Sequence, residues 1–315
     1  FDKLIVPYSK SAEESSETTA MYNPVNIDEF IGYTSNFDFK AQFEKLFEKE
    51  VSIIVVTNPE FYKAFNELIN EENFPLIKNW ILLNTVVSSS SFLTDEFRVE
   101  SGRYSRMMMG TMEAAPKEED AYAVMSGIYA EAVGEYYGRT YFGEEAKEDV
   151  RKMVESMIEV YKTRIENNSW LSQETKDMAV RKLETMTIRV GYPDKIDPLY
   201  DEMTADKNKS LLENTMDFTA LLKADNYKDF GEPVDRTVWI VSADVVNAMY
   251  YFMDNSINFP AAILQEPFYS IDQSASENYG GIGAVIAHEI SHAFDQNGSK
   301  FDELGNINNW WTDED

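Results

Sequence analysis

This chain of 315 residues contains only two histidines, and their spacing constrains the local fold more than any other feature of the sequence. His288 and His292 stand four positions apart, and Glu289 directly follows the first. Residues at i and i+4 of an α-helix share one face, with Cβ atoms about 6 Å apart. In a strand they would lie about 13 Å apart and could not bind one ion together. The pattern H-E-x-x-H is therefore useful as a metal site only on a helix.

The residues on either side of this motif also favour a helix. Apolar residues recur at helical spacing from Ile282 to Phe294. Gly280-Gly281 precedes this stretch and Asn297-Gly298 follows it, and such residues commonly mark helix ends. We therefore predict a helix that presents both imidazoles on the same side.

On such a helix, His288 and His292 can bind one tetrahedral zinc ion. Glu289 is then placed to act as a general base toward a water whose pKa zinc lowers to about 7, which is the chemistry of metal-assisted peptide hydrolysis. The alternative is that these residues share a helix by chance and bind no metal. Two histidines placed at random would give this arrangement on the order of once in a thousand chains, so the metal site is the preferred interpretation.

A catalytic zinc site of this type needs a third protein ligand in addition to a position for water. Because the chain has no cysteine and no further histidine, this ligand must be an aspartate or a glutamate. Asp295 lies three residues after His292 and is better placed to bond a ligating imidazole than to reach the ion. The other nearby candidates are Asp302, Glu303, Asp313, Glu314 and Asp315. Glu314 is a weak candidate, and we expect the third ligand beyond residue 315.

Composition excludes several classes of partner and site. The net charge is −28, from 56 acidic and 28 basic residues, which argues against nucleic acid and anionic membranes as partners. The absence of cysteine excludes disulfides and thiolate sites and favours a cytoplasmic location. A secreted or cell-surface location is the alternative, because Phe1 is not an initiator residue. The most apolar stretch, near residues 80–87, is too short to span a membrane, which needs about 20 residues.

The chain is long enough to form two domains. Helical patterns dominate from residue 59 to 187, and another helix is expected near 209–224. Strand-like segments follow at 237–243, 245–253 and 257–263. We therefore predict a mainly α fold with a smaller α+β part: a mostly helical domain over residues 1–205, and a domain over 206–315 that contains the metal helix.

Several motifs resemble, in order and spacing, those of one peptidase family. They are Val246-Asn247-Ala248-Met249-Tyr250, Phe259-Pro260-Ala261-Ala262, Asn278-Tyr279-Gly280-Gly281, H-E-x-x-H with Phe294-Asp295, and Asn309-Trp310-Trp311-Thr312, with Tyr22-Asn23-Pro24, Trp170-Leu171, Lys182-Leu183 and Gly191-Tyr192-Pro193 upstream. The chain thus resembles the neprilysin and endothelin-converting-enzyme family of zinc endopeptidases, and most closely its bacterial oligopeptidases of the PepO type. Met249, Glu266, Ala287 and Ala293 depart from the usual family residues.

This resemblance implies the beginning of a thermolysin-like catalytic domain, with the helical domain covering a cavity that admits short peptides. It also implies that Asn247 and Ala248 belong to an edge strand that binds the substrate backbone, which agrees with peptide recognition by strand addition. An ordinary core strand is the alternative for this segment. The family's third ligand, a glutamate in an E-x-x-x-D motif, has no counterpart here, so we expect an internal fragment that is inactive without the remainder of its polypeptide.

We therefore predict a zinc-dependent endopeptidase that hydrolyses short peptides, with one Zn²⁺ and Glu289 as general base. The alternative is a non-enzymatic binding or adhesion module whose histidines bind a structural metal or none.

Overall fold

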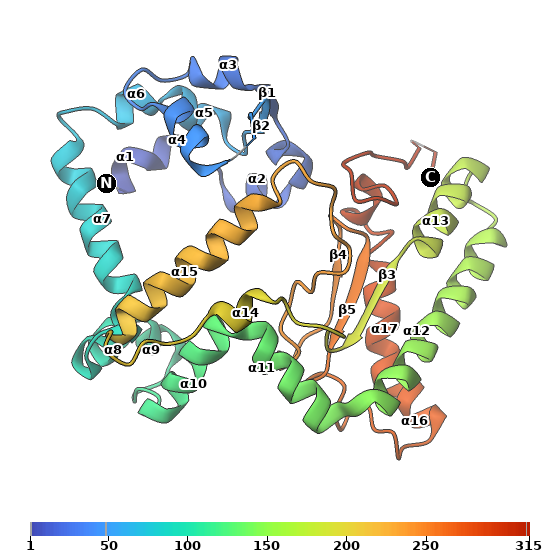
Figure 1. The fold of residues 1–315 in the computed structure, drawn as a ribbon. Helices are drawn as coiled ribbons and strands as arrows, with labels where there is room; N and C mark the ends of the chain where they lie inside the picture. Colours follow the sequence, from blue (N-terminus) through green and yellow to red (C-terminus); the bar gives the residue numbers. More distant parts are fainter. Residues whose placement is uncertain (1, 48, 313) are drawn as a thin grey trace. The chain divides into compact units, whose positions relative to one another are not determined.

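The computed structural model describes residues 2–47, 49–312 and 314–315 and divides into two compact units. Unit 1 consists of Phe1–Ile128 and Asp201–Pro233, and unit 2 consists of Tyr129–Tyr200 and Val234–Asp315. Each unit is therefore assembled from two separate segments of the chain, which the colours of Figure 1 make visible. This division differs from the single boundary after residue 205 expected from the sequence, and the functional roles assigned to the two domains stay predictions.

Unit 1 is mainly helical. Its helices are α1 (Asp2–Ile5), α2 (Ala12–Ser16), α3 (Ile27–Ile31), α4 (Phe39–Leu46), α5 (Pro59–Lys63), α6 (Phe65–Leu68), α7 (Phe74–Ser88), α8 (Asp95–Ser101), α9 (Arg103–Met109), α10 (Lys117–Ile128) and α15 (Leu211–Lys228). Short 3₁₀ turns are η1 (Val6–Tyr8), η2 (Thr18–Met21) and η3 (Ser90–Phe92), and β1 (Pro24–Asn26) pairs antiparallel with β2 (Ile53–Val55). Buried Phe30 packs against the rings of Phe39 and Tyr62, which holds α3, α4 and α5 together.

The apolar stretch 80–87 lies within α7 of unit 1. No helix in the described residues is both long and apolar enough to cross a bilayer.

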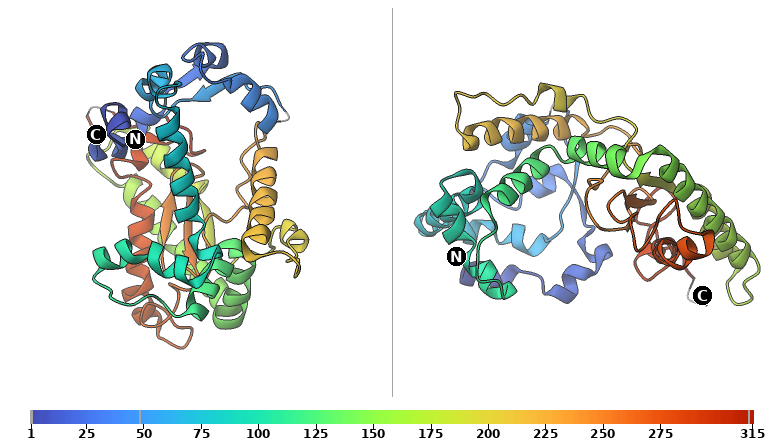
Figure 2. Two further views of the ribbon diagram at one scale, coloured as in Figure 1. Left: turned by 90° about the vertical axis from the view of Figure 1, so that its left-hand side faces the viewer. Right: turned by 90° about the horizontal axis from the view of Figure 1, so that it is seen from below.

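Unit 2 combines helices with a small sheet. Its elements are α11 (Ala130–Tyr137), the π-helical turn η4 (Gly138–Phe142), α12 (Gly143–Glu166), α13 (Gln173–Glu184), β3 (Thr187–Gly191), β4 (Met249–Tyr251), β5 (Ser256–Pro260), α16 (Ala275–Gly280), α17 (Ile282–Ser291) and η5 (Gly298–Lys300). The short helix α14 (Leu199–Glu202) spans the boundary between the units. Within this unit α17 packs against α12, and Figure 2 shows the red part of the chain beside the green helix.

The sheet of unit 2 has the order β3-β5-β4, with β3 parallel and β4 antiparallel to the central strand β5. All five residues of β5 are buried. Apolar side chains of the sheet form one core with α12 and α17. This core includes Ile257 and Phe259 of β5, Val154 of α12 and Ile286 of α17. This arrangement places the metal helix against the sheet and against a helix more than a hundred residues earlier in the chain.

The prediction of a mainly α fold with a smaller α+β part is confirmed. The strand expected at 237–243 is wrong, because this segment forms turns and bends. β4 lies within the expected segment 245–253, and β5 overlaps the expected segment 257–263 but begins one residue earlier. β3 was missed because it is short and directly follows a helix. Its pairing with β5, about 70 residues later, explains why α12 and α13 belong to the unit of the metal helix.

Candidate metal centre

The two histidines lie on helix α17, as their spacing predicts. The helix begins after Gly281 and extends to Ser291, so His292 is its C-cap residue with α-helical backbone angles. Ile282, Ile286 and Ile290 are fully buried in the core of unit 2. At about 100° per residue, His288 and His292 point roughly opposite to this isoleucine stripe. The apolar stripe thus anchors the helix and leaves the imidazoles on its free side.

The imidazoles are close enough to bind one ion. His288 Nε2 and His292 Nε2 are 3.1 Å apart, and two nitrogens bound tetrahedrally to zinc at about 2.0–2.1 Å would be about 3.3 Å apart. One ligand atom each from His288, Glu289 and His292 lie within 4.8 Å of one another, which makes this the one such group of three among the described residues. The donor set and its spacing therefore fit a zinc ion.

Asp295 fixes the orientation of one imidazole. Its Oδ2 is 2.7 Å from His292 Nδ1, while its Oδ1 accepts the backbone N–H groups of Asn297 and Gly298, both at 2.8 Å. Burial raises the pKa of the Asp295 carboxyl, but these three hydrogen bonds outweigh that effect and hold the pKa below its ordinary value. An ionised carboxylate accepts a hydrogen bond from Nδ1–H, so the proton stays on Nδ1 and Nε2 of His292 keeps the lone pair that a metal needs. The structure therefore contains a contact between Asp295 and the imidazole of His292, whereas metal ligation by His292 stays a prediction.

Glu289 has a different environment from its neighbours. Its side chain is only 5% exposed, because about 100° of helical rotation from His288 brings it to the side of the isoleucine stripe. Burial raises the pKa of Glu289, and the opposing effects of His292, His288 and a hydrogen bond from the backbone N–H of Tyr250 do not cancel this shift. A carboxylate with a raised pKa is suited to accept a proton near neutral pH.

The hydrogen bond from Tyr250 also brings strand β4 beside the predicted base. Asn247 and Ala248 immediately precede β4, and the Asn247 side chain accepts the backbone N–H of Ala248 at 2.9 Å. Within the described chain, β4 pairs with β5 alone and is an edge strand. Asn247 is exposed and Ala248 is half-buried, so this short segment is accessible. Its predicted role in binding substrate stays a prediction.

The candidate third ligands do not join the group of three. The carboxylate of Asp302 accepts backbone N–H groups of its own turn, and Glu303 forms an ion pair with Arg181 at 3.5 Å. Asp315 bonds Ser172, Thr175 and Thr312. Glu314 is exposed, and Asp313 lies outside the described residues. The expectation of a ligand beyond residue 315 stays a prediction.

A buried polar environment surrounds Lys182 on α13 and was not predicted from the sequence. Its side chain is fully buried, and Nζ donates hydrogen bonds to the carbonyls of Ala293, Gly298 and Phe301 at 2.8–2.9 Å. Burial lowers the pKa of Lys182 to about 7, against the opposing effect of the carboxylates of Asp302, Asp295 and Glu303. Helical periodicity could have indicated that Lys182 is buried, because it falls on the same face of α13 as the buried residues Thr175, Ala179 and Leu183.

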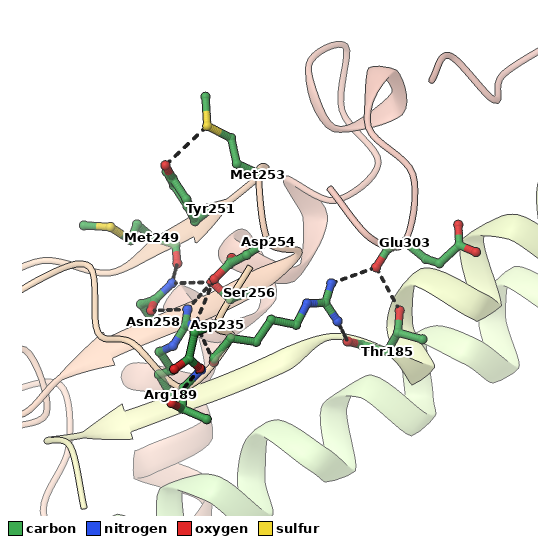
Figure 3. Close-up of polar contacts among 12 residues, drawn as sticks. Thr185, Arg189, Asp235, Met249, Tyr251, Met253, Asp254, Ser256, Asn258 and Glu303 are labelled. Atoms are coloured by element: carbon green, nitrogen blue, oxygen red, sulfur yellow. Dashed lines mark hydrogen bonds and ion pairs between the residues drawn. The ribbon is translucent and has the colours of Figure 1, made fainter. Parts of the chain in front are cut away.

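A second buried network lies on the polar face of the sheet (Figure 3). Arg189 of β3 donates hydrogen bonds to Ser256 Oγ, Asn258 Oδ1, Asp254 Oδ2 and the carbonyl of Arg236. Arg236 in turn donates to the carbonyls of Thr185 and Glu303 at 3.3 and 3.0 Å. This network ties the loop after η5 to the end of α13 and to the sheet, and thereby supports the region that follows the metal helix.

The chain is similar in sequence to known peptidases. Sequence models described as Peptidase family M13 match residues 1–193 and 247–315. The neutral endopeptidase of Lactococcus lactis subsp. lactis (strain IL1403) is 43% identical over 315 residues, which are 100% of this chain and 50% of that protein.

Two solved structures are similar over 99% of the chain. PEPO from Lactobacillus rhamnosis HN001 has a TM-score of 0.93 at 34% identity, with 49% of its chain covered. The zinc metalloprotease ZMP1 of Mycobacterium tuberculosis, in complex with an inhibitor, has a TM-score of 0.86 at 29% identity, with 47% covered. The chain thus spans about half the length of the relatives that it matches.

Proposed function

Because this chain belongs to peptidase family M13, we propose that it forms part of a zinc-dependent endopeptidase that hydrolyses short peptides. The resemblance to neprilysin and PepO-type enzymes noted in the sequence is confirmed by this membership. The observation that carries the proposal is the approach of His288 Nε2 and His292 Nε2 to 3.1 Å beside buried Glu289.

His288 and His292 would hold the zinc ion, whose bound form supplies Lewis acidity and lowers the pKa of water. Glu289 accepts a proton from the attacking water and later returns it to the amine of the departing peptide, which is ordinary general acid–base catalysis. Asp295 keeps the proton of His292 on Nδ1 so that Nε2 faces the metal. A third ligand supplied by another part of the polypeptide would complete the site.

The substrate peptide would align with the segment that leads into β4. An extended peptide can add to an exposed strand edge through backbone hydrogen bonds. Asn247 and Ala248 would make these bonds, because they lie at the start of an edge strand whose Tyr250 N–H already contacts Glu289. A peptide bound there would therefore run beside the base.

Replacement of Glu289 by Gln in the full polypeptide tests the role of the base. Peptide hydrolysis should fall by about 10²–10⁴-fold, the usual contribution of a general base, while zinc content is unchanged. Glu277→Gln is a matched control, because Glu277 caps α16 and a glutamine fits a capping box equally well. Retained hydrolysis in Glu289→Gln would refute the assignment of the base.

Zinc dependence is tested separately on the unmodified polypeptide. A chelator should abolish hydrolysis and added zinc should restore it. A protein that neither binds zinc nor cleaves peptides under these conditions would instead support a binding or adhesion module.

A further inference from the structure

Lys182 is a charged side chain in an interior position. It is 0% exposed, and its Nζ donates hydrogen bonds to three backbone carbonyls and to no carboxylate: Ala293 O at 2.9 Å, Gly298 O at 2.8 Å and Phe301 O at 2.8 Å. The rings of Tyr250 and Trp310 lie 5.7 and 5.5 Å from the same nitrogen. An amino group so fully enclosed is costly to bury unless its hydrogen bonds are satisfied, as they are here.

All three carbonyls belong to one segment, the turn 293–301 that begins directly after His292. This segment follows the metal helix, includes the 3₁₀ helix η5 and contains Asp295. These carbonyls lie beyond the end of α17, and Lys182 supplies donors to them from α13, in addition to Phe301 N–H at Gly298 O and Trp310 Nε1–H at Phe301 O. The lysine therefore helps to hold the chain segment that follows His292.

One residue, Gly298, connects Lys182 to Asp295 beside the candidate metal site. Gly298 accepts a hydrogen bond from Lys182 through its carbonyl and donates its N–H to Asp295 Oδ1 at 2.8 Å. Asp295 Oδ2 in turn contacts His292 Nδ1 at 2.7 Å. Glycine is required at this point, because a Cβ at position 298 would lie 2.0 Å from the carbonyl oxygen of His292. The contacts thus run without a break from Lys182 through Gly298 and Asp295 to the imidazole.

We propose that Lys182 is a positioning residue for the metal ligand His292, acting through the turn 293–301 and Asp295. This proposal rests on the proposed zinc site. Lys182 touches neither the ion nor the substrate; it fixes the carboxylate that fixes the imidazole. Partners of ligating histidines commonly contribute 10–100-fold to metal affinity, and a residue one step further away should act at the lower end of this range.

The test is the substitution Lys182→Met in the full polypeptide. Methionine fills the space of the lysine side chain but removes the hydrogen-bond donors of Nζ. Zinc affinity, measured by competition with a chelator, should fall on the order of 10-fold. The visible spectrum of the cobalt-substituted protein should also change, because it reports the ligand arrangement independently of activity. Lys182→Gln, which keeps some donors, should show a smaller loss and serves if the methionine variant does not fold.

Thr175→Val is the matched control for a general loss of stability. Thr175 is equally buried on the same face of α13, but its hydroxyl bonds Asp315 rather than the turn 293–301. This control should leave zinc affinity and the cobalt spectrum unchanged. Equal effects of Thr175→Val and Lys182→Met on zinc would overturn the proposal.

A double-mutant cycle with Asp295→Ala tests the route of the effect. If Lys182 acts through Asp295, adding Lys182→Met to the Asp295→Ala variant should change its zinc affinity by less than about twofold. A change of this size is no larger than the usual deviation from additivity between independent sites. Full additivity would overturn the proposed route. Failure of the unmodified protein to bind zinc would instead refute the proposed function, so the two failures are distinguishable.

Discussion

Replacement of Asp295 by Asn isolates the contribution of one carboxylate to the metal site. In the structure, Oδ2 faces His292 Nδ1 at 2.7 Å, whereas Oδ1 accepts two backbone N–H groups at 2.8 Å. An asparagine has a single acceptor oxygen. It can either accept from the two backbone groups and present its NH₂ to the imidazole, or accept from the imidazole and leave the backbone groups without a partner.

The first orientation is favoured, because it keeps two hydrogen bonds and the turn intact. The NH₂ group then faces Nδ1 as a donor, so the imidazole must carry its proton on Nε2, where the metal would bind. Loss of such a partner costs about 10–100-fold in metal affinity, which corresponds to about 1.4–2.7 kcal/mol. We expect Asp295→Asn to weaken zinc binding by this amount while the fold is retained.

The assay is zinc competition with a chelator of known affinity, together with circular dichroism to verify folding. Asp302→Asn is the control, because it removes the same charge from the same segment but from a carboxylate that bonds only its own turn. Equal zinc affinity of Asp295→Asn and the unmodified protein would refute the assignment of the Nδ1 contact. A similar loss in Asp302→Asn would show a general effect of charge instead.

Three further predictions concern stability of the full polypeptide, measured by urea unfolding. Ile286→Ala removes a fully buried side chain beneath the metal helix and should cost about 2–5 kcal/mol; a loss below 1 kcal/mol would contradict the packing described. Ser172→Ala removes the cap of α13 and should cost about 1 kcal/mol, seen also as faster hydrogen exchange in its first turn. Burial lowers the pKa of Lys182 to about 7 from 10.5, so between these values the folded protein binds fewer protons than the unfolded chain. The stability of the unmodified protein relative to Lys182→Met should therefore rise above pH 7 by up to about 1.4 kcal/mol per pH unit, and a constant difference would refute this environment.

The metal helix was predictable because its determinants are local. The four-residue spacing of His288 and His292 and the isoleucine stripe both follow from one helical period, and the structure contains that helix. Asp295 was predictable for the same reason, because three residues of helix and turn bring it to His292. Short-range geometry was therefore sufficient for these parts of the site.

The remaining features depend on contacts between distant segments. β3 owes its existence to pairing with β5, and the expected strand at 237–243 does not form even though its residues favour strands. Helical periodicity places Lys182 on the buried face of α13, but only the distant segment 293–301 gives its amino group hydrogen-bond partners. Such relationships cannot be read from periodicity, because they are determined by which segments meet in three dimensions.

The alternation of the two units along the chain has a consequence for biosynthesis. Unit 1 obtains α15 only after the first half of unit 2 has been translated, and unit 2 obtains β4, β5 and α17 only after that. Neither unit can therefore complete its core before a segment of the other unit has been translated. In each unit, the first segment is therefore synthesised before the later segment with which it forms a compact unit.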